Sequence, residues 1–383
     1  MSSLKETQQS IRLKDVHLDS LCKELKDIHS RILEEIPEVA RIAVVSYDHR
    51  NSQLYTFAES STGVNVFSNY SFPLDSCPNL KICAEQRRTR VVDDLPATLN
   101  RNNKHSNWLL DQGFKSSYTV PIYTGQNFIG FIFYDSHYKG LFTEEIQQKL
   151  TIYCDLIGFS VNTEYSLLNA ILTSAEITKE LSPGYKNESK EHMERMSIYA
   201  QLIAKEVADI YHLDDEMIES VHIFSRLHDI GKSALSTDIL LKPTPLAVRE
   251  REVMRCYVPD GINVVDKILD NLGCPSHRCI EVLKSIVSCH QEFLDGTGYP
   301  NGLSDTEIPI PPRIVTVANI FDALTSHRPY KQACSVSGAL LELEKMVQGG
   351  KLDAHCVNAL REHQEYLVEI IRKYPESDPS VSF

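Results

Sequence analysis

The chain has 383 residues, of which 42% are hydrophobic and 24% are charged, and its formal net charge is −13. This length suggests two domains, and the composition is that of a globular protein. The negative charge argues against non-specific nucleic-acid binding, which needs a basic surface. No apolar run approaches the ~20 residues that cross a bilayer, and the polar start has no signal-peptide core. We therefore expect a cytoplasmic protein with neither a membrane nor a nucleic-acid partner.

The first third of the chain mixes helical and strand patterns. Apolar residues at roughly helical spacing predict a helix over 12–36. Short segments rich in β-branched and aromatic residues predict four strands: 41–48, 52–60, 116–124 and 128–136. Further helices are expected between them, at about 79–87 and 105–113. The predicted class is α+β, with an antiparallel sheet and flanking helices.

A long helix is predicted over 142–172, with Thr143 as its N-cap and Ser182-Pro183-Gly184 as its end. A helix of this length between two domains is typical of a connector and of a dimerisation stalk, so we expect a homodimer. The alternative is a helix that packs on its own domain.

After residue 185 the strand pattern almost vanishes, which predicts an all-α domain. Its helices are expected at 187–210, 215–229, 247–256, 261–271, 276–290, 313–326, 336–347 and 353–373. The patterns together predict four segments: an N-terminal helix (1–27), an α+β domain (28–160), a connecting helix (142–183) and the all-α domain (185–383).

Four motifs of the all-α domain combine imidazole, carboxylate and cationic side chains. They are HMER at 192–195, HDIGK at 228–232, HQEFLDGTGYPNGL at 290–303 and RIVTVANIFDALTSHRPYK at 313–331. Each alone has a structural explanation: an HD dipeptide arises by chance, a single helical histidine is usually hydrogen-bonded in a core, and DGTG is a turn sequence. Together they offer ligands for iron, manganese or similar metals, with cations for phosphate oxygens. The combination indicates metal-assisted hydrolysis of a phosphate ester.

These motifs resemble those of the HD-GYP domain, a subfamily of HD phosphohydrolases, in their order and spacing over about 185–370. The resemblance implies hydrolysis of cyclic di-GMP to a linear dinucleotide or GMP, or of 3′,3′-cGAMP in some members. It also implies two or three ions, often iron or manganese, and a metal-bridging hydroxide that attacks phosphorus. Residues 28–160 resemble a GAF domain, on GFKSSYTVPIY and FIGFIFYDS, which implies a sensor or dimerisation module.

The resemblance also implies roles for individual residues. One ion is expected at the positions of His192, His228, Asp229 and Asn319. A second is expected at the positions of Asp229, Tyr257, His290 and Gln291. Glu188 matches an extra glutamate of trinuclear members. His228, Asp229 and Lys232 are the expected catalytic residues. The expected substrate-binding residues are Lys232, Arg313, Arg328, Lys331 and Tyr299.

Three of the ligand positions depart from the family pattern, because Tyr257 and Gln291 replace histidines and Asn319 replaces an aspartate. An amide carries no charge, and glutamine is a poor ligand for a transition metal. Tyrosine coordinates well only as phenolate, and its reference pKa is about 10. We therefore expect a weakly held, mononuclear or sub-stoichiometric Fe or Mn ion. Asp322, His277 or His327 are possible substitute ligands.

Three hypotheses follow. In the first, the protein is a degenerate HD-GYP protein that binds cyclic di-GMP as a receptor or regulatory scaffold under GAF control. In the second, it is an active metal-dependent phosphodiesterase with an unusual site. In the third, it is an interaction protein whose GYP loop docks onto a partner such as a diguanylate cyclase domain.

Overall fold

The computed structural model describes residues 20–49, 52–63, 71–99, 104–182, 189–240, 242, 244–273, 276–326 and 333–376. They form two compact units. One comprises Asp19–Asn169 with Asp214–Glu219, and the other comprises Ala170–Leu213 with Ser220–Phe383. The domain boundaries given above remain predictions, and residues 1–19 of the expected N-terminal helix lie outside the described residues.

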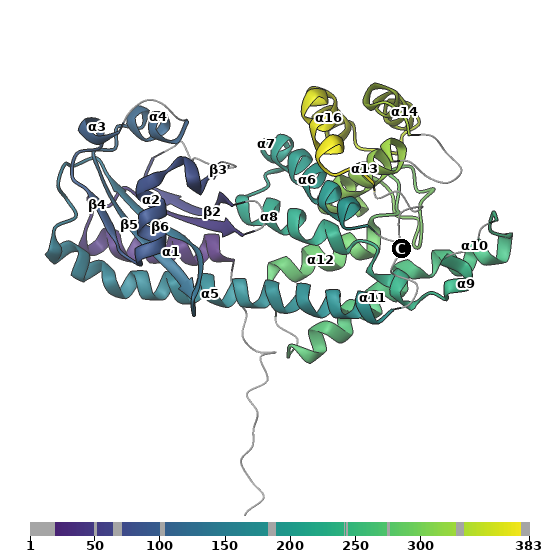
Figure 1. The fold of residues 1–383 in the computed structure, drawn as a ribbon, viewed down its shortest axis with the longest axis horizontal. Coiled ribbons are helices and arrows are strands. Elements are labelled where there is room, and N and C mark those ends of the chain that lie inside the picture. Colours follow the sequence, from purple (N-terminus) through teal and green to yellow (C-terminus); the bar gives the residue numbers. More distant parts are fainter. Residues whose placement is uncertain are drawn as a thin grey trace, which may run out of the picture. The chain divides into compact units, whose positions relative to one another are not determined.

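In the described part of the first unit, six strands form one antiparallel sheet (Figure 1). Their order across the sheet is β3-β2-β1-β6-β5-β4. The strands are β1 (Arg41–Asp48), β2 (Gln53–Ser61), β3 (Ser71–Pro73), β4 (Arg90–Val92), β5 (Ser116–Thr124) and β6 (Asn127–Ser136). The helices are α1 (Leu21–Glu35), α2 (Pro78–Gln86), α3 (Leu95–Thr98), α4 (Lys104–Asp111) and α5 (Glu144–Leu181), whose residues from Ala170 onward belong to the second unit. The α+β prediction is confirmed.

Both faces of the central strands are buried because consecutive side chains point to opposite sides. On β1, Ile42 and Val44 pack with α1 and with Phe142–Val161, while Ala43 and Val45 pack with α2. Burial on two faces explains why the predicted strand 41–48 reads as a continuous apolar run.

The second unit is helical in its described part, as predicted. Its α-helices are α6 (Lys190–Glu206), α7 (Ala208–Tyr211), α8 (Asp215–Phe224), which begins in the first unit, α9 (Thr237–Leu240), α10 (Val248–Arg255), α11 (Tyr257–Asn271), α12 (Arg278–Cys289), α13 (Ile310–Thr325), α14 (Val336–Gln348), α15 (Ala354–Glu362) and α16 (Gln364–Lys373). The short 3₁₀ turns η4 (Ser225–Leu227) and η5 (Ile230–Ala234) follow α8. Helix α6 packs against α13, and α11 packs against η5.

The structure differs from the predicted elements in a few places. Strands β3 and β4 have only three residues each, too few to show a period of two. The helix expected over 353–373 is two helices that meet at His363. The helix expected over 215–229 ends at Phe224, and η4 carries the chain to His228.

None of the described helices has both the length and the apolar character needed to cross a membrane.

Candidate metal and ligand pocket

The first part of the site is a histidine held by a carboxylate. Ser189 caps α6 by accepting a hydrogen bond from the His192 backbone N–H. His192 Nδ1 lies 2.7 Å from Oδ2 of Asp322 on α13, and it donates because a carboxylate only accepts. The ring therefore keeps the lone pair on Nε2, the atom that a metal ion would bind.

Arg195, one turn after His192, holds the same carboxylate. Its Nε donates to Asp322 Oδ1 at 2.6 Å, and its Nη2 donates to Asp322 Oδ2 at 3.1 Å and to Ser326 Oγ at 2.9 Å. Burial acts to raise the pKa of Asp322, but the bonds from His192 and Arg195 lower it to about 2. Asp322 is thus a fixed anion that orients His192, and it is not free to replace Asn319 as a ligand.

The HD dipeptide lies at the end of the turn that follows α8. His228 Nδ1 donates to the carbonyl of Ser225 at 2.8 Å, so its lone pair also lies on Nε2. Lys232 Nζ lies 2.5 Å from Asp229 Oδ2. Burial acts to raise the pKa of Asp229, but the neighbouring His228 and Lys232 lower it well below its usual value. Asp229 is therefore an ionised carboxylate available to a cation.

A close contact between two glycines positions this turn. A Cβ on Gly231 would lie 1.8 Å from the carbonyl oxygen of Tyr257 and 2.4 Å from the backbone nitrogen of Gly261. Only glycine allows the HDIGK turn to approach the start of α11 so closely. This contact brings Asp229 and Lys232 beside Tyr257, with Lys232 Nζ 5.7 Å from the centre of the tyrosine ring.

The second part of the site is a hydrogen-bonded cluster of Tyr257, His290 and Gln291. His290 Nδ1 donates to the carbonyl of Ile286 at 3.0 Å, so Nε2 accepts from the Tyr257 hydroxyl at 2.9 Å. Gln291 Nε2 donates to the same hydroxyl at 2.9 Å. Burial, with the charge of Asp229, raises the pKa of Tyr257, so the phenol keeps its proton. Burial also lowers the pKa of His290, which is a neutral imidazole.

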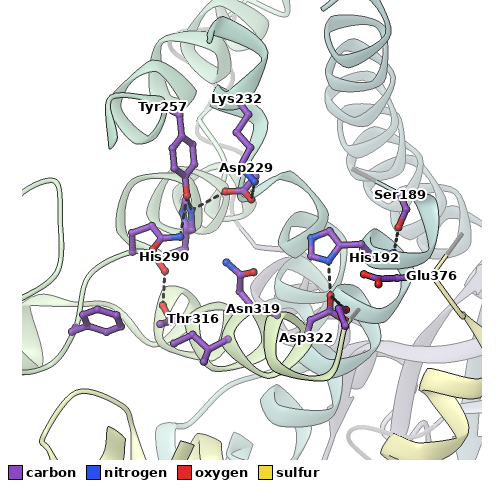
Figure 2. Close-up of a pocket in the computed structure, with 15 residues that line it drawn as sticks. Ser189, His192, Asp229, Lys232, Tyr257, His290, Thr316, Asn319, Asp322 and Glu376 are labelled. Carbon is purple, nitrogen blue, oxygen red and sulfur yellow. Dashed lines mark hydrogen bonds and ion pairs between the residues drawn. The ribbon is translucent and has the colours of Figure 1, made fainter. Parts of the chain in front are cut away.

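These groups surround a pocket of about 550 Å³. Figure 2 shows Asn319 on α13 pointing into the same space as His192 and Asp229. His228 does not line the pocket directly, but its ring centre lies 5.9 Å from that of His192 and 5.2 Å from that of His290. The structure therefore gathers seven expected ligand residues: His192, His228, Asp229, Tyr257, His290, Gln291 and Asn319.

The loop that follows His290 is organised by its own glutamate. Glu292 is 2% exposed, and its carboxylate accepts hydrogen bonds from the backbone N–H groups of Asn301 and Leu303 at 2.7 and 3.1 Å. A Cβ on Gly298 would lie 2.4 Å from Glu292 Cα, so the loop folds tightly onto this residue. The carboxylates of the loop stabilise its shape and are not pocket ligands, because Asp295 accepts from Thr297 in a local turn.

Two of the expected substrate-binding residues lie elsewhere in the second unit. The Arg313 guanidinium donates to the carbonyls of Ile308 and Asp305 and is not among the residues that line the pocket. Tyr299 packs beside Tyr257, and the guanidinium carbon of Arg255 lies 5.0 Å from the centre of its ring. Neither Arg313 nor Tyr299 lines the pocket.

Several expectations fall on positions that the structure does not describe: Glu188, His327, Arg328 and Lys331. His277, another possible substitute ligand, caps α12 by accepting from the Cys279 backbone N–H, and it does not line the pocket. Sequence reasoning missed the positioning role of Asp322 and Arg195, and it missed Glu376 altogether. The HxxR spacing was a usable signal for the former, because residues three apart on a helix share a face.

The donor set fits one divalent ion better than two. His192 and His228 offer two imidazoles and Asp229 one carboxylate, and Asn319 lines the same pocket as His192 and Asp229. At the second position the lone pair of His290 already accepts the Tyr257 proton. The residues there do not fit a second ion of the kind that the resemblance implies.

Comparison with known proteins agrees with this geometry. Residues 180–356 match the HD domain family model. This segment is an HD domain. The HD domain contains the two motifs that position His192 and His228, and it ends before α16.

The curated relatives are named as cyclic dinucleotide phosphodiesterases. The cyclic di-GMP phosphodiesterase response regulator RpfG of Xanthomonas campestris pv. campestris is 37% identical over 183 residues, which are 48% of this chain and 45% of the relative. The 3′3′-cGAMP-specific phosphodiesterase 2 of Vibrio cholerae is 30% identical, over 61% of this chain and 43% of the relative. A cyclic di-GMP phosphodiesterase of Thermotoga maritima is 30% identical, over 63% of this chain and 62% of the relative. The chain therefore spans about two fifths to three fifths of the length of these relatives.

Solved structures similar to this chain include GAF domains. The GAF domain/HD domain protein of Geobacter sulfurreducens has 20% sequence identity and a TM-score of 0.32, over 39% of this chain and 96% of that one.

Proposed function

We propose that the HD domain binds a cyclic dinucleotide together with a single divalent metal ion, and that it hydrolyses this ligand weakly or not at all. The observation that carries the proposal is the bond from the Tyr257 hydroxyl to His290 Nε2, which occupies the second metal position with a proton. The ligand class is supported by the names of the relatives, which are phosphodiesterases of cyclic di-GMP or 3′3′-cGAMP. The protein would then act as a receptor or regulatory scaffold.

In this proposal His192, His228 and Asp229 hold the ion, which is iron or manganese by the chemistry of the ligands. A bound ion supplies positive charge to a phosphate oxygen. Asp322 keeps the Nδ1 proton of His192 in place, and Lys232 lies beside Asp229 as a cation for the ligand. Arg328 and Lys331 follow α13 in the sequence and are proposed as further phosphate contacts.

A second candidate is an active phosphodiesterase with this one-ion site. It is favoured by the three retained ligands and by the ion pair of Lys232 with Asp229, which survive beside the altered positions. Both candidates bind a cyclic dinucleotide, but only the phosphodiesterase hydrolyses it.

Two interactions are proposed besides the ligand. A homodimer through α5 is supported by Ile152, Leu156 and Phe159, which lie at i, i+4 and i+7 and are 62%, 46% and 72% exposed. A diguanylate cyclase domain is proposed as a partner of the GYP loop, whose rim at Asp295 and Thr297 is exposed. Light scattering tests the homodimer, because Phe159→Glu places a charge on the exposed apolar face of α5 and is expected to yield monomers.

The test of the main proposal uses purified protein loaded anaerobically with Fe(II) or with Mn(II). Metal per chain is counted, cyclic di-GMP binding is measured by calorimetry, and nucleotides are separated chromatographically after incubation. We expect at most one ion per chain, binding, and little or no linear product. Turnover by the wild type, with none by His228→Ala, would establish an active enzyme instead; one ion per chain would then identify the second candidate, and two ions per chain would contradict the account of the second metal position.

A further inference from the structure

The C-terminal segment after α16 reaches the metal and ligand pocket. Arg195 Nη1 donates to the carbonyl of Tyr374 at 2.8 Å, and Arg195 Nη2 lies 3.7 Å from Oε1 of Glu376. Glu376 is one of the residues that line the pocket. Figure 2 shows its side chain beside His192 and near Ser189.

The anchor of this segment is rigid. The Arg195 side chain is 3% exposed, and its other donors bind Asp322 and Ser326. The guanidinium that fixes the carboxylate behind His192 therefore also fixes Tyr374, two residues before Glu376. A side chain of the C-terminal segment is held at the pocket by the same group that orients a metal ligand.

The negative charge of Glu376 is compensated less than the charges of Asp322 and Asp229, the other carboxylates of the pocket. Asp322 takes two short hydrogen bonds from Arg195, and Asp229 takes one from Lys232. Among the described residues, the ion-pair contact of Glu376 is the 3.7 Å approach to an arginine whose charge Asp322 already shares, and the Glu376 side chain is 32% exposed. A phosphodiester carries the same sign of charge, and like charges in one pocket repel each other.

We propose that Glu376 sets the affinity of the pocket for anionic ligands, because its carboxylate opposes the entry of a phosphodiester beside His192. The inference rests on the proposed function for the identity of the ligand, a cyclic dinucleotide. It adds a residue of the C-terminal segment to the binding determinants, outside the matched HD domain. Displacement of this segment then strengthens binding, and its docking weakens binding.

The experiment compares the full chain, loaded with Mn(II), with its Glu376→Gln and Glu369→Gln variants. Each change removes one carboxylate at nearly constant volume, and Glu369 is an exposed residue of α16 that does not line the pocket. Calorimetry measures the affinity for cyclic di-GMP and, separately, for inorganic phosphate. We expect Glu376→Gln to bind both anions about 3- to 10-fold tighter at low salt, with Glu369→Gln unchanged. The gain should shrink in high salt because screening weakens exposed charges.

The outcomes separate this inference from the proposed function. If cyclic di-GMP binds no variant but phosphate binds Glu376→Gln more tightly, the proposed ligand is wrong and the role of Glu376 stands. If the wild type binds cyclic di-GMP and Glu376→Gln binds both anions no better, the role of Glu376 is overturned alone. Binding of neither anion to any variant also overturns it. A fall of tenfold or more in Mn(II) affinity on Glu376→Gln would make Glu376 a metal ligand and overturn the repulsive role.

Discussion

The hydroxyl of Tyr257 lies 2.9 Å from Nε2 of His290 and donates its proton to the only lone pair that this imidazole has. Gln291 donates to the same hydroxyl. Two of the three altered positions therefore form one hydrogen-bonded unit with a retained histidine, and they are not two independent losses of a ligand. Because of this unit, replacing Tyr257 or Gln291 alone is expected to leave metal binding at the second position almost unchanged.

Restoring the histidines and the aspartate should restore the second ion. The triple variant Tyr257→His, Gln291→His, Asn319→Asp is expected to raise bound Mn(II) from about one to about two ions per chain, and cyclic di-GMP turnover should rise with it. Elemental analysis and chromatography of the nucleotides measure both. Asn319→Asp alone is the control, since it leaves the Tyr257 bond to His290 intact. A triple variant that still holds one ion would contradict this account of the second position.

Asp322→Asn should weaken metal binding without removing a metal ligand. The amide cannot keep both the charge and the two acceptor oxygens that orient His192, and loss of such an outer partner costs about 10- to 100-fold in metal affinity. Titration with Mn(II), followed by electron paramagnetic resonance, measures the change. Ser326→Ala is a matched control, because Ser326 contacts Asp322 and Arg195 but not His192. Equal affinities in the two variants would remove the positioning role of Asp322.

Glu292→Gln should loosen the GYP loop. The amide can accept from only one of the Asn301 and Leu303 N–H groups, and its NH₂ faces the other donor. We expect a loss of about 1–3 kcal/mol in unfolding free energy and faster amide exchange over 298–303. Denaturant titration and hydrogen exchange measure these effects. The control is Asp295→Asn, in the exposed part of the loop. It should change the unfolding free energy and the amide exchange over 298–303 much less than Glu292→Gln does.

The first unit should lose stability in mild acid because of His29. This ring is buried between the Ser60 hydroxyl and the Val39 carbonyl, at 2.8 and 2.9 Å, and burial lowers its pKa while the Val39 bond acts to raise it. Below pH ~6.5 the unfolded chain binds a proton that the folded unit does not, so stability falls as the pH drops. His29→Gln should flatten the fall in melting temperature between pH 7 and 5.5. His49→Gln, on an exposed residue, should keep the full wild-type slope.

The strands and the grouping of the ligand residues can be predicted from the sequence, because they depend on residue periodicity and on motif spacing. Strand 41–48 and strand 116–124 agree with β1 and β5: β1 has apolar side chains on both faces of the sheet, and β5 alternates, with Tyr118, Val120 and Ile122 on one face. The expected ligand residues in the described part of the chain do gather around one pocket, because motif spacing reflects their helical scaffold. Neither periodicity nor motif spacing indicates which acceptors from distant segments a side chain will bind. Arg313 is expected at the ligand, yet it donates to Asp353, 40 positions away, as well as to the carbonyls of Asp305 and Ile308.

The bond from Arg195 to Tyr374 joins residues 179 positions apart. During synthesis, α6 leaves the ribosome long before α16 exists, and a contact of such separation closes a long loop at an entropic cost. The guanidinium that steadies His192 through Asp322 therefore lacks one of its acceptors until α16 and Tyr374 have docked. Completion of the metal site thus waits for a segment that is synthesised long after the helix that carries His192.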